Sequence, residues 1–267
     1  MTTLIVVPAR FGSTRFPGKP LALINGISMV RRTARIAQDA AKQIEDCSYV
    51  VATDNENIQA HCHDHDIPVV MTPENLPTGS DRAFAAAHQI APSPDFIVNL
   101  QGDAPFTPVE HIVAVATALE YGADVATPYI RLTWEALDAL RAHKQETPFS
   151  GTTLIIGADN KAVWFSKNII PAIRKEDDLR KTSKLSPICR HVGLYAYRRD
   201  ALEKFVNWPE SAFEKLEGLE QLRLLENGLS IECVQVEPPK VATPGIDTPE
   251  DLALAERLIA QHGDPFA

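Results

Sequence analysis

The sequence predicts an α/β fold built on a doubly wound, mostly parallel sheet. Two observations support this prediction. Short apolar runs rich in β-branched residues alternate with segments of helical periodicity over the first 130 residues, which is the pattern of βαβ units. A loop rich in glycine and in cations directly follows the first apolar run. Ligands of such sheets bind beyond the carboxyl ends of the strands, where this loop is expected to lie.

The predicted elements of the first half alternate as parallel pairing requires. Each predicted strand is a short apolar run, and each predicted helix places apolar side chains three or four positions apart. The strands are expected at residues 4–7, 49–53, 69–71, 96–100 and 125–130, and the helices at residues 28–44, 56–65, 80–90 and 108–121.

The pattern changes after about residue 130. Residues 151–157 and 162–166 predict a hairpin around Asp159-Asn160, and residues 191–197 alternate like a further strand. The charged stretch 174–184 is expected to run over the surface. We therefore predict one domain over residues 1–267, with a smaller, mixed β-containing subdomain inserted at about residues 130–200.

Three elements are predicted near the C-terminus. Residues 213–227 predict a helix that stops at Gly228, and its leucines are expected in an ordinary core rather than in a partner-binding zipper. Residues 231–236 predict a strand, and Thr248-Pro-Glu-Asp251 predicts the capped start of a helix over residues 248–261. The leucines of the first helix are Leu216, Leu219, Leu222 and Leu225.

Composition limits the classes of function. The chain has 267 residues, of which 45% are hydrophobic, and this length suffices to bury roughly three quarters of the unfolded surface. A net charge of -9 argues against a nucleic-acid or acidic-membrane binder. No run approaches the ~20 apolar residues of a membrane span, so a soluble cytoplasmic protein is expected. The four cysteines form no C-x-x-C pair, which favours reduced, structural thiols.

The loop over residues 8–21 is the first candidate functional segment. Glycines and cations between a strand and a helix suggest a phosphate site. It is not a Walker A loop, because five residues separate Gly12 from Gly18 and Pro20 follows Lys19. The G-x-G-x-x-G fingerprint of dinucleotide binding is absent as well. The residues alone are therefore consistent with two interpretations, a phosphate-binding loop of another kind or a solvated turn.

The order of residues in this loop, Pro8-Ala-Arg-x-x-Ser-Thr-Arg-x-Pro-Gly-Lys-Pro-Leu21, is similar to the signature of sugar nucleotidyltransferases. It most closely resembles the family of 3-deoxy-manno-octulosonate (Kdo) cytidylyltransferases, or CMP-Kdo synthetases. Collinear matches continue to near the end of the chain, at V-A-T-D (51–54), T-G-S-D-R (78–82), V-N-L-Q-G-D (98–103), H-V-G-L-Y (191–195), L-E-Q-L-R (219–223) and I-D-T-P-E-D (246–251).

This resemblance implies a Rossmann-like sheet of the nucleotide-diphospho-sugar transferase type, a homodimer, and a β-containing elaboration that serves dimerisation and sugar binding. The implied reaction transfers CMP from CTP to the anomeric hydroxyl of Kdo, with Mg²⁺, and releases pyrophosphate for lipopolysaccharide biosynthesis. Catalysis is then mostly positioning and charge neutralisation. Bringing the sugar carboxylate to ~4 Å from a phosphate charge costs ~1 kcal/mol in water and ~4 kcal/mol at an effective dielectric constant of about 20.

The resemblance also implies roles for single residues. Lys19 suits a triphosphate contact because it is a flexible point charge. Arg15 is expected beside it, with a surface cation on the loop rim as the alternative. The catalytic residues implied are Lys19, Arg10, Asp103 and Asp247, the further nucleotide-binding residues are Ala9, Ser13, Arg15, Thr78, Gly79 and Ser80, and the sugar-binding residues are Arg82, Gln101, His191, Tyr195, Glu220 and Gln221.

Asp103 and Asp247 are the predicted Mg²⁺ ligands. Asp103 follows the predicted strand 96–100, and Asp247 lies just before a predicted helix. Mg²⁺ commonly takes one or two carboxylates and completes its shell with phosphates and water. The alternatives are a turn residue for Asp103 and a helix N-cap for Asp247.

Two other segments have alternatives. Glu220 and Gln221 fit sugar hydroxyls, but they could equally form the wet face of the leucine helix. In His61-Cys-His-Asp-His-Asp66, the spacing of His61 and His65 could place both on one helix face, yet without distant ligands a solvated helix end is preferred over a metal site.

Three positions depart from the family pattern. Ala104 replaces a glutamate, residues 148–154 replace a typical F-N-P-N-x-V-K segment, and Lys167 replaces an arginine. Because lysine keeps the charge but loses bidentate geometry, a cytidylyltransferase for a different sugar acid is the first alternative function. A glycosyltransferase on the same sheet is a further alternative, and it would generally carry a D-x-D-like metal motif. A non-catalytic nucleotide-binding relative is the last alternative.

Overall fold

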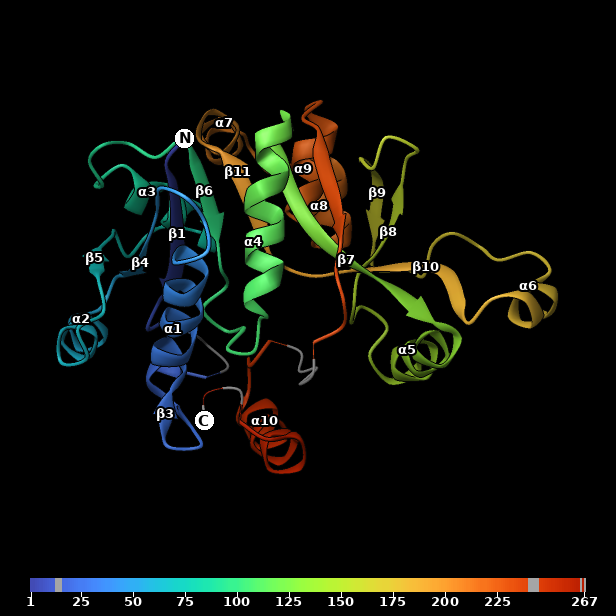
Figure 1. Cartoon of the computed structure of the whole chain (residues 1–267), viewed down its shortest axis with the longest axis horizontal. Coiled ribbons are helices and arrows are strands. Elements are labelled where there is room, and N and C mark those ends of the chain that lie inside the picture. Colours follow the sequence, from blue (N-terminus) through green and yellow to red (C-terminus); the bar gives the residue numbers. More distant parts are fainter. Residues whose placement is uncertain (13–15, 240–244, 265, 267) are drawn as a thin grey trace.

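The computed structural model describes residues 1–12, 16–239, 245–264 and 266. These residues form a ten-stranded sheet with the strand order β5-β4-β1-β6-β11-β7-β10-β8-β9, in which β12 pairs with β7 (Figure 1). The pairs β1–β4, β1–β6, β4–β5 and β7–β12 are parallel. The predicted α/β fold class is confirmed. The parallel strands of the first half are β1 (Thr3–Ala9), β4 (Cys47–Thr53), β5 (Val69–Met71) and β6 (Phe96–Asn99).

Helices cover both faces of this sheet, as the doubly wound prediction requires. Ile5 and Val7 pack in one core with side chains of α1, α2 and α4, whereas Leu4 and Val6 pack in a second core with side chains of α3, α7 and α9. Alternation of β1 side chains between the two cores follows from the two-residue period of a strand. The helices of the first half are α1 (Met29–Ala41), α2 (Glu56–His63), α3 (Gly79–Ala87) and α4 (Val109–Ala118), followed by the 3₁₀ turn η2 (Leu119–Tyr121).

The second half extends the same sheet with antiparallel strands. The predicted hairpin is present as β8 (Thr153–Ile156) and β9 (Ala162–Ser166), and Asn160 adopts a left-handed φ of 61° in its turn. Because β8, β9 and β10 continue the main sheet, the structure adds no separate sheet at residues 130–200. The inserted subdomain stays a prediction.

The single strand predicted over residues 191–197 is wrong. The structure has two strands, β10 (Leu185–His191) and β11 (Tyr195–Arg198), which both pair with β7 (Val125–Thr133). The break lies opposite Pro128 of β7, which has no amide hydrogen to donate to a ladder. Val192 donates its amide hydrogen to the carbonyl of Pro128 at 3.1 Å. Pro128 cannot return a hydrogen bond, so the regular ladder between the two segments is interrupted at this position.

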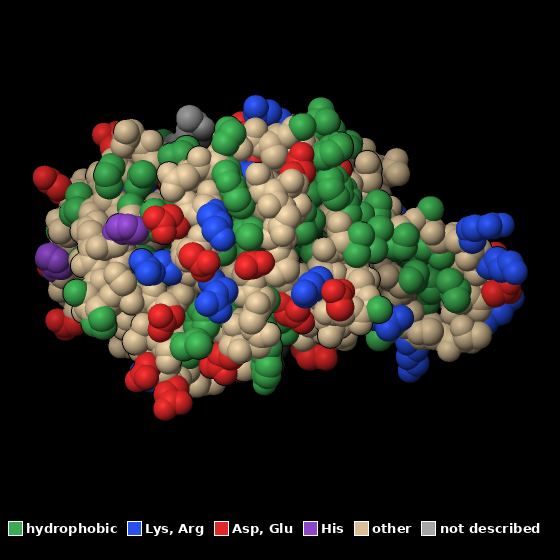
Figure 2. All heavy atoms as spheres, turned by 90° about the horizontal axis from the view of Figure 1, so that it is seen from above, with side chains coloured by type: hydrophobic (Ala, Val, Ile, Leu, Met, Phe, Trp, Pro, Cys, Tyr) green, Lys and Arg blue, Asp and Glu red, His purple; other side chains and the backbone are tan. Residues whose placement is uncertain are grey.

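Three helices of the second half were not predicted. The helix α5 (Trp134–Glu146) starts at Thr133, whose hydroxyl accepts a hydrogen bond from the amide of Ala136. Next, α6 (Glu176–Thr182) lies within the charged stretch and buries none of its residues, which agrees with the predicted surface position. Figure 2 shows basic side chains gathered at that end of the molecule, with both signs of charge interspersed elsewhere on the face in view. The third is α7 (Arg199–Asn207).

The continuous helix predicted over residues 213–227 is also wrong. Gly218 adopts a left-handed φ of 62° and separates α8 (Ala212–Glu217) from α9 (Gln221–Glu226). Leu219 and Leu222 are buried as expected, but Leu216 is 78% exposed because the break rotates α8 out of register with the core.

The predicted C-terminal strand and helix are confirmed as β12 (Ile231–Gln235) and α10 (Pro249–His262). Thr248 caps α10 in a reciprocal capping box with Asp251. Among the residues that the structure describes, no helix has the length and apolar character that a membrane crossing needs.

Candidate active site

The loop that follows β1 is fixed at its start by a buried ion pair. The amide of Phe11 donates to Oδ1 of Asp54 at 3.1 Å, and Oδ2 of Asp54 accepts from Arg82 at 2.7 Å. Both charged side chains are buried, and burial lowers the pKa of Arg82 from its ordinary value, with the nearby charge of Arg10 adding to this effect. Arg10 itself is exposed, while Ala9 is buried. Ser13 and Arg15 lie outside the described residues.

Lys19 contacts both predicted metal ligands, Asp103 and Asp247, which are far apart in the sequence. Its Nζ lies 3.0 Å from Oδ2 of Asp103 and 3.0 Å from Oδ1 of Asp247. Lys19 opens the short helix η1 (Lys19–Leu21), just after Gly18, which has a left-handed φ of 70°. Two carboxylates that converge on one cation in water-accessible surroundings form a compact, charged centre at the carboxyl edge of β1 and β6.

Close backbone contacts place both aspartates. Gly102 lies so near β1 that a Cβ at this position would stand 2.2 Å from the carbonyl oxygen of Pro8. The amide of Ile246 donates to the carbonyl of Asp103 at 2.9 Å, so the chain before α10 is tied directly to the turn after β6. Thr248, and not Asp247, is the N-cap of α10, which shows that the N-cap alternative for Asp247 is wrong. Asp103 does lie in a turn, as its own alternative required.

We expect Gly102→Ala to destabilise the fold, because the added methyl group meets backbone rather than a flexible side chain. Overpacking of this kind costs about 1–3 kcal/mol and would also displace Asp103. Urea unfolding would measure the loss. Gly193→Ala is the matched control, because a Cβ at Gly193 has nothing within 4 Å. Equal midpoints for both variants would contradict the close-approach argument.

The carboxylates of Asp103 and Asp247 fit a Mg²⁺ ion in chemical type, and they lie close to each other. Each has an oxygen 3.0 Å from the same nitrogen, so these two oxygens are at most 6.0 Å apart, twice that distance. No group of three or more His, Cys, Asp or Glu side chains with metal-site geometry occurs within residues 1–12, 16–239, 245–264 and 266. A two-carboxylate site that leaves most positions to phosphate and water is the arrangement expected for Mg²⁺ with a nucleotide.

The turn that was predicted to recognise the base lies beside this centre. Thr78 caps α3, and its hydroxyl donates to Asp81 at 2.6 Å. A Cβ on Gly79 would lie 3.4 Å from Oε1 of Gln101, which places the predicted nucleotide and sugar residues in contact. Ser80 is buried, and its hydroxyl donates to Glu220 at 3.2 Å. The side chain of Ser80 therefore links the two halves of the predicted site.

Buried polar groups line the part predicted to bind the sugar. Asn99 is fully buried and donates to the hydroxyl of Ser80 at 3.3 Å, while its Oδ1 has no hydrogen-bond partner among the described residues. Burial raises the pKa of Glu220 from its ordinary value. Gln221 is 4% exposed, so the wet-face alternative is wrong for Gln221, and its Nε2 has no partner in the part of the chain that the structure describes. Unpartnered buried amide atoms are costly without a ligand or water.

His191 and Tyr195 adjoin these groups. Their rings lie 5.4 Å apart, and Nε2 of His191 is 2.9 Å from the hydroxyl of Thr127. Burial lowers the pKa of His191 to about 3, and the charge of Lys167 adds to the lowering. Burial raises the pKa of Tyr195 well above its usual range. Both side chains are therefore neutral, and the charge of Lys167 stands near His191.

Comparisons with known proteins agree with this arrangement. A model of the cytidylyltransferase family matches residues 4–231. A 3-deoxy-manno-octulosonate cytidylyltransferase of Maricaulis maris is 41% identical over 266 residues, which cover 99% of this chain and 99% of the relative. The chain belongs to the 3-deoxy-manno-octulosonate cytidylyltransferase family. The resemblance inferred from the motifs is thereby confirmed.

Further relatives support the same assignment. A 3-deoxy-manno-octulosonate cytidylyltransferase of Bdellovibrio bacteriovorus is 36% identical and covers 97% of this chain and 98% of its own. The solved structure of CMP:2-keto-3-deoxy-manno-octonic acid synthetase complexed with CTP has a TM-score of 0.81, is 30% identical, and covers 98% of this chain and 99% of that chain. A 4-diphosphocytidyl-2C-methyl-D-erythritol synthase of Anaerococcus prevotii, at 12% identity and a TM-score of 0.57, shares the fold.

Two residues of the site were missed by the sequence analysis. Asp54 and Asn99 received no role, although both lie in the family motifs V-A-T-D and V-N-L-Q-G-D. Each stands at or just after the end of a buried parallel strand, where a polar residue is a signal of a site. Asp54 positions the loop through Phe11, and Asn99 positions Ser80.

Two of the three departures from the family pattern, the segment 148–154 and Lys167, meet at Lys144. Its ammonium donates to the backbone carbonyls of Ser150, of Gly151 at 3.0 Å and of Lys167 at 2.6 Å. It thus joins the altered segment 148–154 to the lysine that replaces the family arginine. Lys144 had no sequence signal, because the helix α5 that carries it was not predicted.

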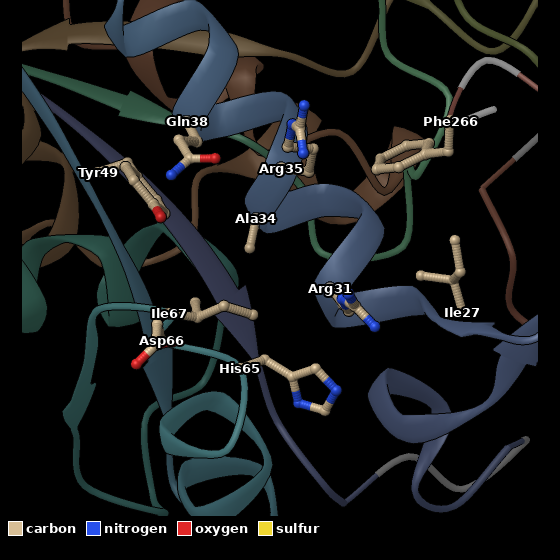
Figure 3. Close-up of a pocket in the computed structure, with 10 residues that line it drawn as sticks. All are labelled: Ile27, Arg31, Ala34, Arg35, Gln38, Tyr49, His65, Asp66, Ile67 and Phe266. Carbon is tan, nitrogen blue, oxygen red and sulfur yellow. The ribbon is translucent and has the colours of Figure 1, made fainter.

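Two cavities formed by the described residues lie apart from the Lys19 centre. One of about 300 Å³ opens on α1 and includes Arg31, Arg35 and Tyr49 (Figure 3). Another of about 780 Å³ lies between α1, α4 and the chain after β12. Neither is lined by Lys19, Asp103 or Asp247.

The histidine-rich segment is engaged within the protein. Nε2 of His61 lies 2.7 Å from the hydroxyl of Ser28, and Nδ1 of His65 donates to the carbonyl of His61 at 2.8 Å. Burial lowers the pKa of His61. His61 therefore supports the start of α1, where the hydroxyl of Ser28 makes no capping bond of its own.

Proposed function

We propose that this protein transfers CMP from CTP to the anomeric hydroxyl of Kdo, or of a close ulosonate, and releases pyrophosphate in a Mg²⁺-dependent reaction. The observation that carries the proposal is the convergence of Asp103 and Asp247 on Lys19 at the carboxyl edge of the sheet. The names of the relatives at 36–41% identity support the choice of CTP and Kdo.

Lys19 and Arg10 would bind the triphosphate. The ammonium of Lys19 contacts two carboxylate oxygens, so it can exchange one of these anionic partners for a phosphate oxygen and remain paired with negative charge. Preorganised cations of this kind stabilise the charge that develops on the leaving pyrophosphate and need little rearrangement during the reaction. Arg10 lies in the same loop as Lys19 and is exposed, so it is accessible to the nucleotide.

The sugar acid would lie between Gln101 and the groups around Glu220. The unpartnered amide of Gln221 offers a hydrogen-bond donor to a sugar hydroxyl, and Glu220 offers an acceptor. Lys167, close to His191, supplies a positive charge for the sugar carboxylate. These contacts would orient the anomeric hydroxyl toward the α-phosphorus for in-line attack.

Asp103 and Asp247 would hold Mg²⁺ through their carboxylate oxygens. The chemistry that bound Mg²⁺ supplies is neutralisation of phosphate charge and a lower pKa for the attacking hydroxyl.

A different ulosonate is the second candidate substrate. Lys167 stands where the family has arginine, and Lys144 fixes its backbone together with the altered segment 148–154. A lysine contacts a carboxylate as a point charge and not as a bidentate fork, so the preferred sugar acid can differ.

The test is pyrophosphate release from each of four nucleoside triphosphates with a panel of Kdo, its 8-amino analogue and neuraminate. We expect release with CTP, and with Kdo or its 8-amino analogue. Pyrophosphate release that occurs only with neuraminate would show that neuraminate, and not Kdo, is the sugar acid substrate. Absence of release with every pair would refute a catalytic role and favour the non-catalytic relative.

We further propose a homodimer that forms through the β-containing elaboration. Along the described residues, β9 is the edge of the sheet, and Val163 on this strand is 57% exposed. Phe149 and Leu216 are each 78% exposed. Large exposed apolar side chains near a free strand edge are typical of a contact surface. A cytoplasmic location remains an expectation from the sequence.

A further inference from the structure

The helix α10 begins two residues after Asp247 and has few contacts with the rest of the molecule. Figure 1 shows α10 below the sheet and its covering helices, at the lower edge of the molecule. Ala255 and Ile259 of α10 pack in a small core with Ile24, Met29 and Phe106. This core is separate from the two cores that cover the sheet. The position of α10, and with it that of Asp247, therefore depends on local attachments.

The strongest of these attachments is a buried ion pair at the far end of α10. Arg32 of α1 has no exposed surface, and it donates through Nη1 to Oδ1 of Asp264 at 2.8 Å and through Nη2 to Oδ2 at 2.7 Å. Such bidentate pairs combine strength with a fixed geometry. The Arg32 guanidinium holds the pKa of Asp264 well below its usual range.

Other contacts surround the Arg32–Asp264 pair, and we call the whole attachment the clasp. Nε and Nη2 of Arg32 donate to the carbonyl of Ile24 at 3.1 Å and 2.7 Å. Asp264 also accepts from the side chain of Asn25 at 3.0 Å and from the amide of Phe266 at 3.0 Å. The guanidinium lies 4.9 Å from the centre of the Phe266 ring, which Figure 3 shows beside α1. These contacts tie the chain that follows α10 to α1 and to the turn at residues 24 and 25.

The clasp is connected to the Lys19 centre at both ends. On one side, the amide of Met29, at the start of α1, donates to the carbonyl of Ala22 at 2.9 Å, directly after the turn that holds Lys19. On the other side, α10 joins Asp264 to Asp247, which lies 3.0 Å from Lys19. Lys19 and Asp247 are therefore each held by elements that meet at Arg32.

We propose that the pair Arg32–Asp264 is a positioning device that anchors α10 and so holds Asp247 against Lys19 and Asp103. This inference rests on the proposed function, in which Asp247 takes part in the reaction. Arg32 and Asp264 touch neither substrate nor metal and act through Asp247. The consequence is that loss of the clasp loosens α10 while the sheet remains intact.

The test compares the full-length protein with Asp264→Asn and with the control Glu256→Gln. Glu256 lies on α10 and accepts a bond from the amide of Asn25 at 3.2 Å, but it does not contact Arg32. Hydrogen exchange is measured without substrates on peptides that cover residues 247–262 and on peptides from β1 and β4. The Mg²⁺ concentration that gives half-maximal pyrophosphate release, and kcat at saturating Mg²⁺, are measured separately.

We expect Asp264→Asn to speed exchange over residues 247–262 at least ~10-fold with β1 and β4 unchanged, since local opening is limited by local contacts. The half-activating Mg²⁺ concentration should rise by about tenfold, with a smaller fall in kcat at saturation, because bound ligand favours the competent arrangement. Glu256→Gln should leave both quantities near those of the wild type. Asp264→Glu should restore part of the protection.

Faster exchange throughout β1 and β4 would show a general structural role and would overturn the proposal, as would unchanged exchange over residues 247–262. If Asp264→Asn does not fold, Arg32→Lys tests the same point, because lysine keeps the charge but not the bidentate geometry. If the wild type releases no pyrophosphate, the proposed function fails, and confined exchange in Asp264→Asn still supports the anchoring of Asp247.

Discussion

Asp103→Asn is expected to lower pyrophosphate release from CTP and Kdo by at least ~10²-fold, because the variant loses a charged ligand from the centre where phosphate charge must be neutralised. The amide is nearly the same size as the carboxylate and can still accept from Lys19, which lies 3.0 Å from Oδ2. Its backbone carbonyl still accepts from Ile246. The fold should therefore persist, and the loss should be seen in kcat more than in the binding of either substrate.

Single-turnover kinetics with purified variants would measure this effect, with urea unfolding to verify that the fold is retained. Asp177→Asn is a suitable control, since Asp177 is exposed on α6. A wild-type rate in Asp103→Asn would remove the carboxylate from the mechanism and, with it, the proposed metal site. An equal loss in Asp177→Asn would indicate an effect of net charge alone.

Lys19→Met is expected to lower kcat/KM for CTP by about 10²–10³-fold, in line with the loss of a preorganised charged group at the reacting phosphates. The methionine fills similar space but leaves the oxygens of Asp103 and Asp247 facing each other without the ammonium between them. Their repulsion should destabilise the apoprotein, and added Mg²⁺ should restore stability, because binding to the native state raises it.

Lys42→Met is the control for loss of one positive charge, since Lys42 pairs with Asp39 at the exposed end of α1. Lys19→Arg should recover only part of the activity, because a guanidinium cannot occupy the same point between two carboxylates. Thermal unfolding with and without Mg²⁺ and steady-state kinetics over a CTP series would distinguish these cases. Equal kcat/KM for Lys19→Met and Lys42→Met would contradict the role of Lys19.

Local sequence pattern and tertiary environment agree over most of the first 130 residues. The strands β1, β4, β5, β6 and β7 and the helices α1 to α4 were predicted because each buried strand is one apolar run and each helix has one apolar face. The short strands β2 (Leu23–Ile24) and β3 (Ile27–Ser28) were not predicted. Pattern and environment disagree at Pro128 and Gly218, where the strand predicted over residues 191–197 and the helix predicted over residues 213–227 are interrupted. The break between β10 and β11 depends on a proline in a neighbouring strand, which no pattern within residues 191–197 reveals.

The same distinction applies to the site. Lys19, Asp103 and Asp247 were named from motifs, but the bond of Arg82 to Asp54 and the bond of Ser80 to Glu220 were not anticipated. Each joins residues that are far apart in the sequence, so only the packing of α3 against its neighbours could reveal it.

By itself the sequence determined the α/β class, the family and the chemical types of the site residues, because these depend on local periodicity and on the order of short motifs. Tertiary structure alone decided that Asp103 and Asp247 meet at one lysine and that Arg32 clasps the chain beyond α10. The physical reason is that the partner of a carboxylate is set by the path of the backbone in space. Lys19 and Asp247 are 228 positions apart, so no local pattern in the sequence signals their contact.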